Sequence, residues 1–150
     1  MVRSDKLDDL YQELILDHYK NPRNRHYIEE ADIKAEADNP FCGDEIALQL
    51  KLANSHVGEV GYQGKGCSIC RASGSMLSEA VVGRTLEEIE ELAATFKGMM
   101  RGRELSKIDT ETLGELKVFL DILKYPIRIK CALLAWVALE EGIQKFRSRA

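Results

Sequence analysis

The hydrophobic pattern of this chain changes period near Cys67, and that change restricts its fold more than any other feature. Before Cys67, apolar side chains alternate with others in the pattern of a half-buried strand, namely Ile46, Leu48, Leu50 and Leu52. Similar alternation at Ile33, Ala35 and Ala37 predicts an earlier strand, and the glycine-weakened stretch VGEVGYQGKG predicts a later one after a turn at ANSH. After Cys67 the apolar residues recur at helical spacing. Strands followed by helices predict an α+β fold, in which a three-stranded antiparallel sheet carries helices packed on one face.

Capping and helix-breaking residues place the predicted helices. An N-terminal helix, with Ser4 or Asp5 as its N-cap, ends before Pro22 and has an apolar face of Leu7, Leu10, Tyr11, Leu14, Ile15 and His18. A short helix follows Cys67, and a capping box of Thr85 and Glu88 opens the next one. The polar segment RGRELSKID is predicted to connect that helix to another over residues 113–123. A last helix is predicted from near Pro126 to about Phe146.

Length and composition restrict the class of protein. At 150 residues, with 45% hydrophobic and 31% charged residues, the chain is predicted to form one soluble domain over residues 1–150. Its longest apolar run, CALLAWVAL, is too short for a membrane span, which needs about 20 residues. The N-terminal sequence MVRSDKLDDL has no signal-peptide core, so we expect a cytoplasmic protein with no membrane partner. The net charge of −4 argues against a nucleic-acid partner.

Positive charge nevertheless gathers in two short segments, HYKNPRNRH (residues 18–26) and YPIRIK (residues 125–130). Two interpretations of each segment stay open, a solvated face and a docking patch for an acidic partner.

Four cysteines in a cytoplasmic chain favour metal binding or thiol chemistry over structural disulfides, because that compartment keeps thiols reduced. Cys42 lies in a predicted turn, NPFCGDE, with Asp44 two residues on. Cys67 joins a predicted strand to a predicted helix, where the helix dipole favours a thiolate. Cys131 follows Arg128 and Lys130, whose positive charges favour a thiolate as well.

Three thiolates and one carboxylate would suit a tetrahedral site for zinc or an iron–sulfur cluster. The spacing alone does not decide, because Cys42, Cys67 and Cys131 are far apart in the sequence. A set of scattered core cysteines remains the alternative, since an unbonded cysteine packs as a small hydrophobic residue.

Four motifs, in order, give the chain a resemblance to a known family. DHYKNPRN, NPFCGDEI, GKGCSICRASGSML and RIKCALLAW resemble the NifU N-terminal/IscU family of iron–sulfur cluster assembly proteins. The resemblance covers essentially the whole chain. It implies that the family's metal ligands, three cysteines and one aspartate, are Cys42, Asp44, Cys67 and Cys131.

Departures from the IscU pattern indicate the SufU-type branch. Lys130 stands where IscU-type scaffolds carry a histidine, and Pro126 stands alone where they carry two prolines. The chain also resembles the SufU type in its insertion FKGMMRGRELSKIDTETLGE.

This branch implies a bound zinc ion and a sulfur acceptor for a SufS-type PLP-dependent cysteine desulfurase, with downstream iron–sulfur assembly proteins as recipients. The resemblance favours Cys42 as the acceptor, whereas an IscU-type protein would use Cys131. We expect Arg128 and Lys130 to guide the persulfide or the desulfurase. The alternative is a scaffold that builds a labile [2Fe–2S] cluster on the same ligands. A structural zinc module is disfavoured by the aspartate ligand.

Cys70, three residues after Cys67, has three interpretations. It is a buried core thiol, an auxiliary ligand or sulfur relay next to Cys67, or half of a redox pair. No βαβ unit of the kind that carries redox pairs is predicted. Because the family has no ligand at this position, we expect Cys70 to stand outside the metal site.

Overall fold

The computed structural model describes residues 12–40 and 42–149. Its three strands, β1 (Ile33–Asn39), β2 (Asp44–Ala53) and β3 (His56–Lys65), form one antiparallel sheet in the order β1-β2-β3. The turn between β2 and β3 places Asn54 and Ser55 at φ angles of 53° and 72°. Two successive positive φ angles are typical of the tight hairpin turns that match the twist of a sheet. The predicted sheet and the ANSH turn are therefore confirmed.

Helices make up most of the remaining chain. A helix over residues 12–20 precedes the sheet, and the others follow it: α2 (Ser68–Ala80), α3 (Leu86–Met100), α4 (Lys107–Leu113), the 3-10 helix η1 (Gly114–Lys124) and α5 (Pro126–Ser148). The predicted N-cap at Ser4 or Asp5 lies outside the described residues. The capping box at the start of α3 is confirmed, with Thr85 and Glu88 each bonded to the other's backbone N–H. None of the helices in the described part of the chain is long and apolar enough to cross a membrane.

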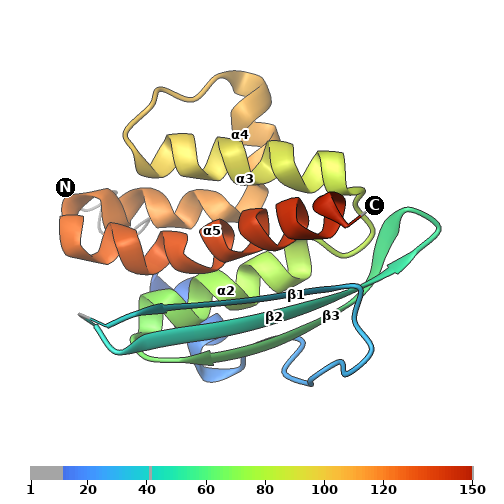
Figure 1. Ribbon diagram of the computed structural model, residues 1–150. Coiled ribbons are helices and arrows are strands. Elements are labelled where there is room, and N and C mark those ends of the chain that lie inside the picture. The colour runs from blue at the N-terminus through green and yellow to red at the C-terminus, as the bar shows by residue number, and fades with distance from the viewer. Residues whose placement is uncertain (1–11, 41, 150) are drawn as a thin grey trace.

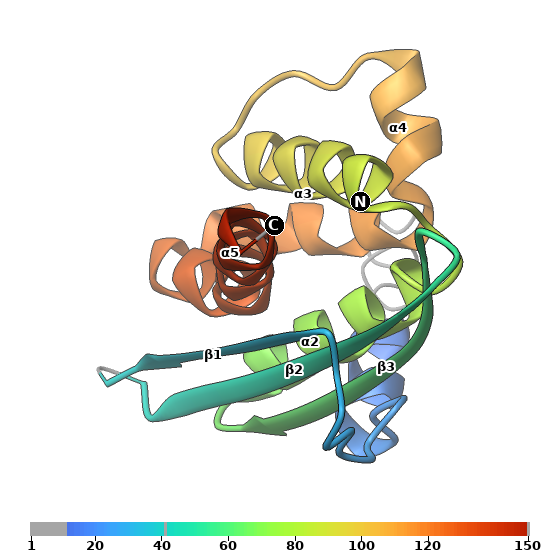
Figure 2. The same cartoon turned by 45° about the vertical axis from the view of Figure 1, so that its right-hand side comes forward.

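The helices lie in layers over one face of the sheet, as predicted. α5 packs against β1 and β2, α2 packs against β3 and α5, and α3 lies beyond α5 (Figure 1). The view in Figure 2 looks closer to the axis of α5 and shows the sheet and α3 on opposite sides of that helix. Aromatic side chains join the helical layers: Phe96 stacks on Trp136 with ring centroids 4.6 Å apart and meets Phe119 edge-on at 5.7 Å.

Two sequence predictions about the insertion were wrong in part. The segment RGRELSKID was predicted as a connector, but its last residues begin α4, which Ser106 and Asp109 cap reciprocally. The region predicted as a helix over 113–123 forms a 3-10 helix instead, after Gly114 adopts a φ of 52°. Three of its four buried side chains, Leu116, Phe119 and Ile122, recur every third residue, and the fourth is Val118. A 3-10 helix has three residues per turn, so this spacing places those three on one face.

The segment between the first helix and β1 is fastened along the outer edge of β3. The Tyr62 N–H donates to the Asn24 carbonyl over 2.7 Å, and the Asn24 side chain donates to Ser78 on α2 over 3.0 Å. His18 fixes the preceding helix, because its Nδ1 lies 2.7 Å from the Ser75 hydroxyl. His18 is therefore a core residue, as its place on the apolar stripe predicts.

Burial of His18 makes the stability of the fold depend on pH. Burial and the nearby Arg23 lower the pKa of His18 below its usual value of 6.5, although Glu79 opposes them. Below pH 6.5 the unfolded chain therefore binds a proton that the folded chain does not, so acidification favours unfolding.

We expect the free energy of unfolding to fall as the pH is lowered from 7 toward the lowered pKa of His18. The substitution His18→Gln should flatten this dependence in urea titrations at a series of pH values. His56→Gln changes an exposed histidine and serves as the control. Equal slopes for the His18→Gln variant and the unaltered protein would contradict the assignment.

Candidate metal centre

Four chain segments meet at one end of the sheet, where the hairpin between β1 and β2 lies beside the starts of α2 and α5 (Figure 1). Cys42 lies in the hairpin and Asp44 is the first residue of β2. Cys67 is the N-cap of α2, and Cys131 lies in the second turn of α5. The structure therefore brings all four predicted ligand residues to one place, although they are spread over much of the sequence.

Two glycines allow the backbone to approach Asp44 closely at this end of the sheet. Gly43 separates Cys42 from Asp44 with a φ of 70°, a conformation that residues with a Cβ seldom adopt. Gly66 precedes Cys67 with a φ of 123°, and a Cβ there would collide with the Asp44 carboxylate. The glycines thus let the hairpin turn sharply and let the end of β3 lie directly against Asp44.

The side-chain atoms of these residues converge closely. One ligand atom from each of Cys42, Asp44 and Cys131 lies within 4.8 Å of the other two. The Sγ atoms of Cys131 and Cys42 are 3.8 Å apart. Cys67 adjoins this group through Asp44, whose Oδ2 lies 3.8 Å from the Cys67 Sγ and whose Oδ1 accepts the Cys67 backbone N–H over 2.9 Å. Asp44 is fully buried.

This donor set fits a metal ion with a preference for sulfur. Two thiolates bound to one tetrahedral zinc ion, with zinc–sulfur bonds of about 2.3 Å, lie about 3.8 Å apart. The separation of Cys42 and Cys131 has this value. Asp44 is a buried carboxylate beside thiols, an arrangement that a cation stabilises by balancing its negative charge. The same thiols and carboxylate also suit an iron–sulfur cluster.

The thiol of Cys131 is poorly placed to ionise without a cation beside it. Burial, followed by hydrogen bonds with Asp44 and Cys67, raises the pKa of Cys131 far above the usual range for a thiol. Arg128 offers partial compensation from the rim of the site. Its contacts with Cys131 and, to a smaller extent, Cys67 raise the pKa of the guanidinium. Of the two residues predicted to guide the persulfide, Arg128 therefore lies against the thiols of Cys131 and Cys67, whereas Lys130 does not share this position.

Lys130 instead lines an open pocket next to Cys42. This pocket has a volume of about 500 Å³ and is lined by Asn39, Cys42, Pro126, Ile127 and Lys130. Ile127 is 73% exposed, so the mouth of the pocket is apolar as well as positively charged. The sequence analysis did not select Asn39 or Ile127 for the site, because their place beside Cys42 depends on how α5 meets the hairpin.

Cys70 belongs to the hydrophobic core next to this centre. Its side chain is fully buried, and burial raises its pKa to about 12, with a further contribution from Asp44. Only its backbone N–H contacts the site, at 3.5 Å from the Cys67 Sγ. The thiol of Cys70 therefore stays protonated at neutral pH, which agrees with the interpretation of a core residue.

Comparisons with known proteins identify the family of this chain. The family model described as the NifU-like N terminal domain matches residues 10–132 of this chain. The zinc-dependent sulfurtransferase SufU of Bacillus subtilis is 42% identical over 139 residues, covering 93% of this chain and 92% of that protein. The iron–sulfur cluster assembly scaffold protein IscU of Streptococcus pyogenes is 36% identical over 140 residues, covering 93% and 86%.

A solved structure has the same fold. The crystal structure of a putative iron–sulfur cluster assembly scaffold protein for the SUF system, from Fervidobacterium islandicum, superposes with a TM-score of 0.82 at 34% identity. The superposition covers 87% of this chain and 94% of the other. The match to the family model and the two curated relatives show that this chain belongs to the NifU-like N-terminal domain family of iron–sulfur cluster assembly proteins.

Proposed function

We propose that this protein is a zinc-dependent sulfur acceptor, which takes sulfur from a SufS-type PLP-dependent cysteine desulfurase and passes it to downstream iron–sulfur assembly proteins. The observation that carries the proposal is the convergence of Cys42, Asp44 and Cys131, with Cys67 adjoining, beside an open pocket. The relative named as a zinc-dependent sulfurtransferase supports the same function. Cleavage of the carbon–sulfur bond of cysteine belongs to the desulfurase in this scheme.

The ligands of the proposed zinc ion are Cys42, Asp44, Cys67 and Cys131. Zinc bound there would keep the cysteines as thiolates without adding redox chemistry. Asp44 supplies the one oxygen ligand, and oxygen binds such a metal less firmly than thiolate sulfur does. A site of this composition suits exchange of a ligand better than a closed four-sulfur site.

Exposure favours Cys42 as the acceptor over Cys131. The Cys42 side chain is half-buried and lines the open pocket, whereas Cys131 is fully buried. The Cys42 thiolate attacks the outer sulfur of the desulfurase persulfide, and a new sulfur–sulfur bond forms on Cys42. The original sulfur–sulfur bond breaks, the desulfurase cysteine leaves as a thiolate, and the proton of the persulfide stays on the transferred sulfur. No oxidant is needed.

Arg128 and Lys130 fit the role of guiding the incoming persulfide. Lys130 lines the pocket from which Cys42 is reached, and Arg128 lies against the thiols. Both are cations, and the desulfurase cysteine that leaves in this step carries the negative charge of a thiolate. The apolar Ile127 at the same mouth provides contact area for a partner protein.

The test is to locate the sulfur after reaction with a desulfurase and cysteine. Mass spectrometry of the alkylated protein should find one added sulfur atom on Cys42 and none on Cys70. The Cys70→Ala variant should accept sulfur as the unaltered protein does, whereas Cys42→Ala should lose acceptance by at least about a hundredfold. Sulfur found on Cys131, with full acceptance by Cys42→Ala, would contradict the assignment of the acceptor.

A second candidate is a scaffold for a labile [2Fe–2S] cluster. The same three thiols and Asp44 suit such a cluster, and the relative from Streptococcus pyogenes is named a scaffold. Lys130 weighs against this candidate, because it occupies the position of the histidine in IscU-type scaffolds.

A further inference from the structure

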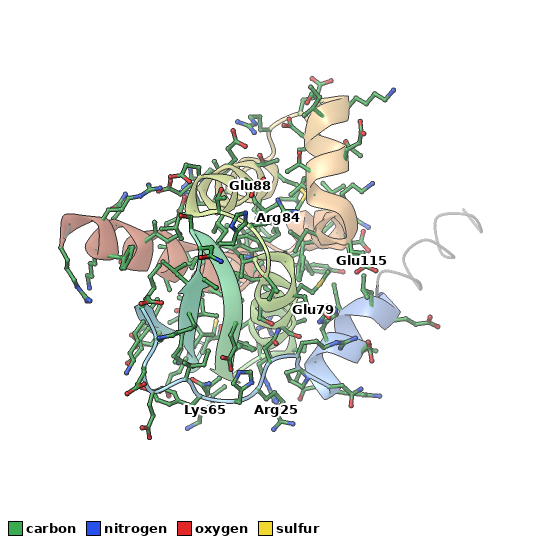
Figure 3. The ribbon with its side chains drawn as sticks, turned by 90° about the vertical axis from the view of Figure 1, so that its right-hand side faces the viewer. Arg25, Lys65, Glu79, Arg84, Glu88 and Glu115 are labelled. Atoms are coloured by element: carbon green, nitrogen blue, oxygen red, sulfur yellow. The ribbon has the colours of Figure 1, made fainter. Side chains whose placement is uncertain are left out.

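A second pocket lies at the outer edge of β3, away from the mouth beside Cys42. It has a volume of about 160 Å³ and is lined by Pro22, Arg25, Tyr62, Gln63, Gly64 and Arg71, which we call the arginine pocket. Arg71 lies on α2 one turn after Cys67, whose carbonyl accepts the Arg71 N–H over 3.1 Å. Figure 3 labels Arg25 on the segment that leads into β1, and Lys65 at the end of β3.

Arg71 has an unmet hydrogen-bond donor. Its Nε is buried without a hydrogen-bond partner, and it is the one such side-chain atom within residues 12–40 and 42–149. Its guanidinium carbon lies 4.8 Å from the centre of the Tyr19 ring, so one face is covered by an aromatic surface. A buried donor without an acceptor is unfavourable, so a bound anion that draws this guanidinium toward the pocket would relieve a cost already present in the fold.

Arg25 adds a second guanidinium to the same pocket. In the described part of the chain neither Arg25 nor Arg71 forms an ion pair. No acidic residue lines the arginine pocket, and Asp17 and Glu79 pair with Arg23, at 2.6 Å and 3.8 Å. The arginine pocket therefore concentrates positive charge in a protein whose net charge is −4.

The strand edge contributes a backbone donor in a fixed position. The Tyr62 N–H points outward from β3, because it donates to the Asn24 carbonyl of the neighbouring segment. Backbone groups two residues apart on a strand point to the same side, so the Gly64 N–H faces the arginine pocket. The segment that carries Arg25 is itself fastened to α2, since the Arg23 N–H donates to Ser75 over 2.9 Å.

We propose that the arginine pocket binds the oxyanion of a small molecule, a phosphate or a carboxylate, between Arg25 and Arg71. Guanidinium groups bind both kinds of oxyanion through paired N–H donors, and the anion would supply the acceptor that the Arg71 Nε lacks. The pocket is large enough for one such group. This proposal does not depend on zinc or on sulfur transfer, since none of the proposed metal ligands lines the pocket.

The experiment is an NMR titration of the full-length protein with inorganic phosphate and, separately, with acetate. The Nε–H signal of Arg71 and the backbone amide of Gly64 should shift to saturation with at least one of the two anions. Chloride at equal ionic strength should not reproduce the shift. Saturation with phosphate alone indicates a phosphate-bearing ligand, and saturation with acetate alone indicates a carboxylate.

Variants assign the binding to the two arginines. Arg25→Gln alters an exposed side chain and should weaken binding about tenfold, measured on the Gly64 amide. Arg71→Met should weaken it at least as much, whereas Arg101→Gln, at an exposed arginine outside the pocket, should leave it unchanged. The proposal is overturned if neither anion gives a saturable shift, or if Arg25→Gln binds as tightly as the unaltered protein.

Discussion

Replacing Cys131 by serine should weaken zinc binding by about a hundredfold. Structural zinc sites contribute about 10–16 kcal/mol, which over four ligands is about 3 kcal/mol for each one. Cys131 lies 3.8 Å from Cys42 and within 4.8 Å of Asp44, so its loss removes the proposed ligand that joins α5 to the hairpin. Competition with a chromophoric chelator measures the affinity.

Cys70→Ala is the matched control for this substitution. It removes a buried core thiol near the centre whose residue contacts Cys67 through its backbone N–H, and it should leave the zinc affinity unchanged. A zinc affinity that is equally weak in both variants would show that Cys70 is a ligand. An unchanged affinity in Cys131→Ser would remove Cys131 from the ligand set.

Replacing Trp136 by alanine should lower the free energy of unfolding by about 3–5 kcal/mol. Trp136 is fully buried, stacks on Phe96 and donates its indole N–H to the Ser73 hydroxyl over 3.1 Å. The substitution leaves a cavity between α3 and α5 and removes the hydrogen bond to α2. Urea denaturation measures the change.

Val137→Ala is the control on the same helix, because Val137 is 37% exposed. It should cost less than about 1 kcal/mol. If Trp136→Ala cost no more than Val137→Ala, the aromatic stack would not be the centre of the helical layers.

The sequence predicted the sheet and the ligand set for different physical reasons. Alternation in β2 shows in the sequence because one face of that strand is buried beneath helices, as at Leu48 and Leu50. The ligand set depended on family motifs, because nothing in the spacing of Cys42 and Cys131 requires their sulfur atoms to meet. Their approach depends on where α5 crosses the end of the sheet.

Neither the 3-10 helix of the insertion nor the arginine pocket could be predicted from hydrophobic periodicity or from the family motifs. The 3-10 helix η1 differs from an α-helix by a small change of period, and Leu120, predicted on its apolar face, is 37% exposed. Arg25 and Arg71 belong to segments that meet where Ser75 and Ser78 fasten the chain to α2. The sequence placed Arg25 in a positive segment but gave no sign of its nearness to Arg71.

The most direct test of the central claim is the metal and acid-labile sulfide content of freshly purified protein. Our account predicts about one zinc ion per chain, held by Cys42, Asp44, Cys67 and Cys131, and no labile sulfide. Iron and labile sulfide in equal amounts, with little zinc, would contradict it and would favour the scaffold function instead.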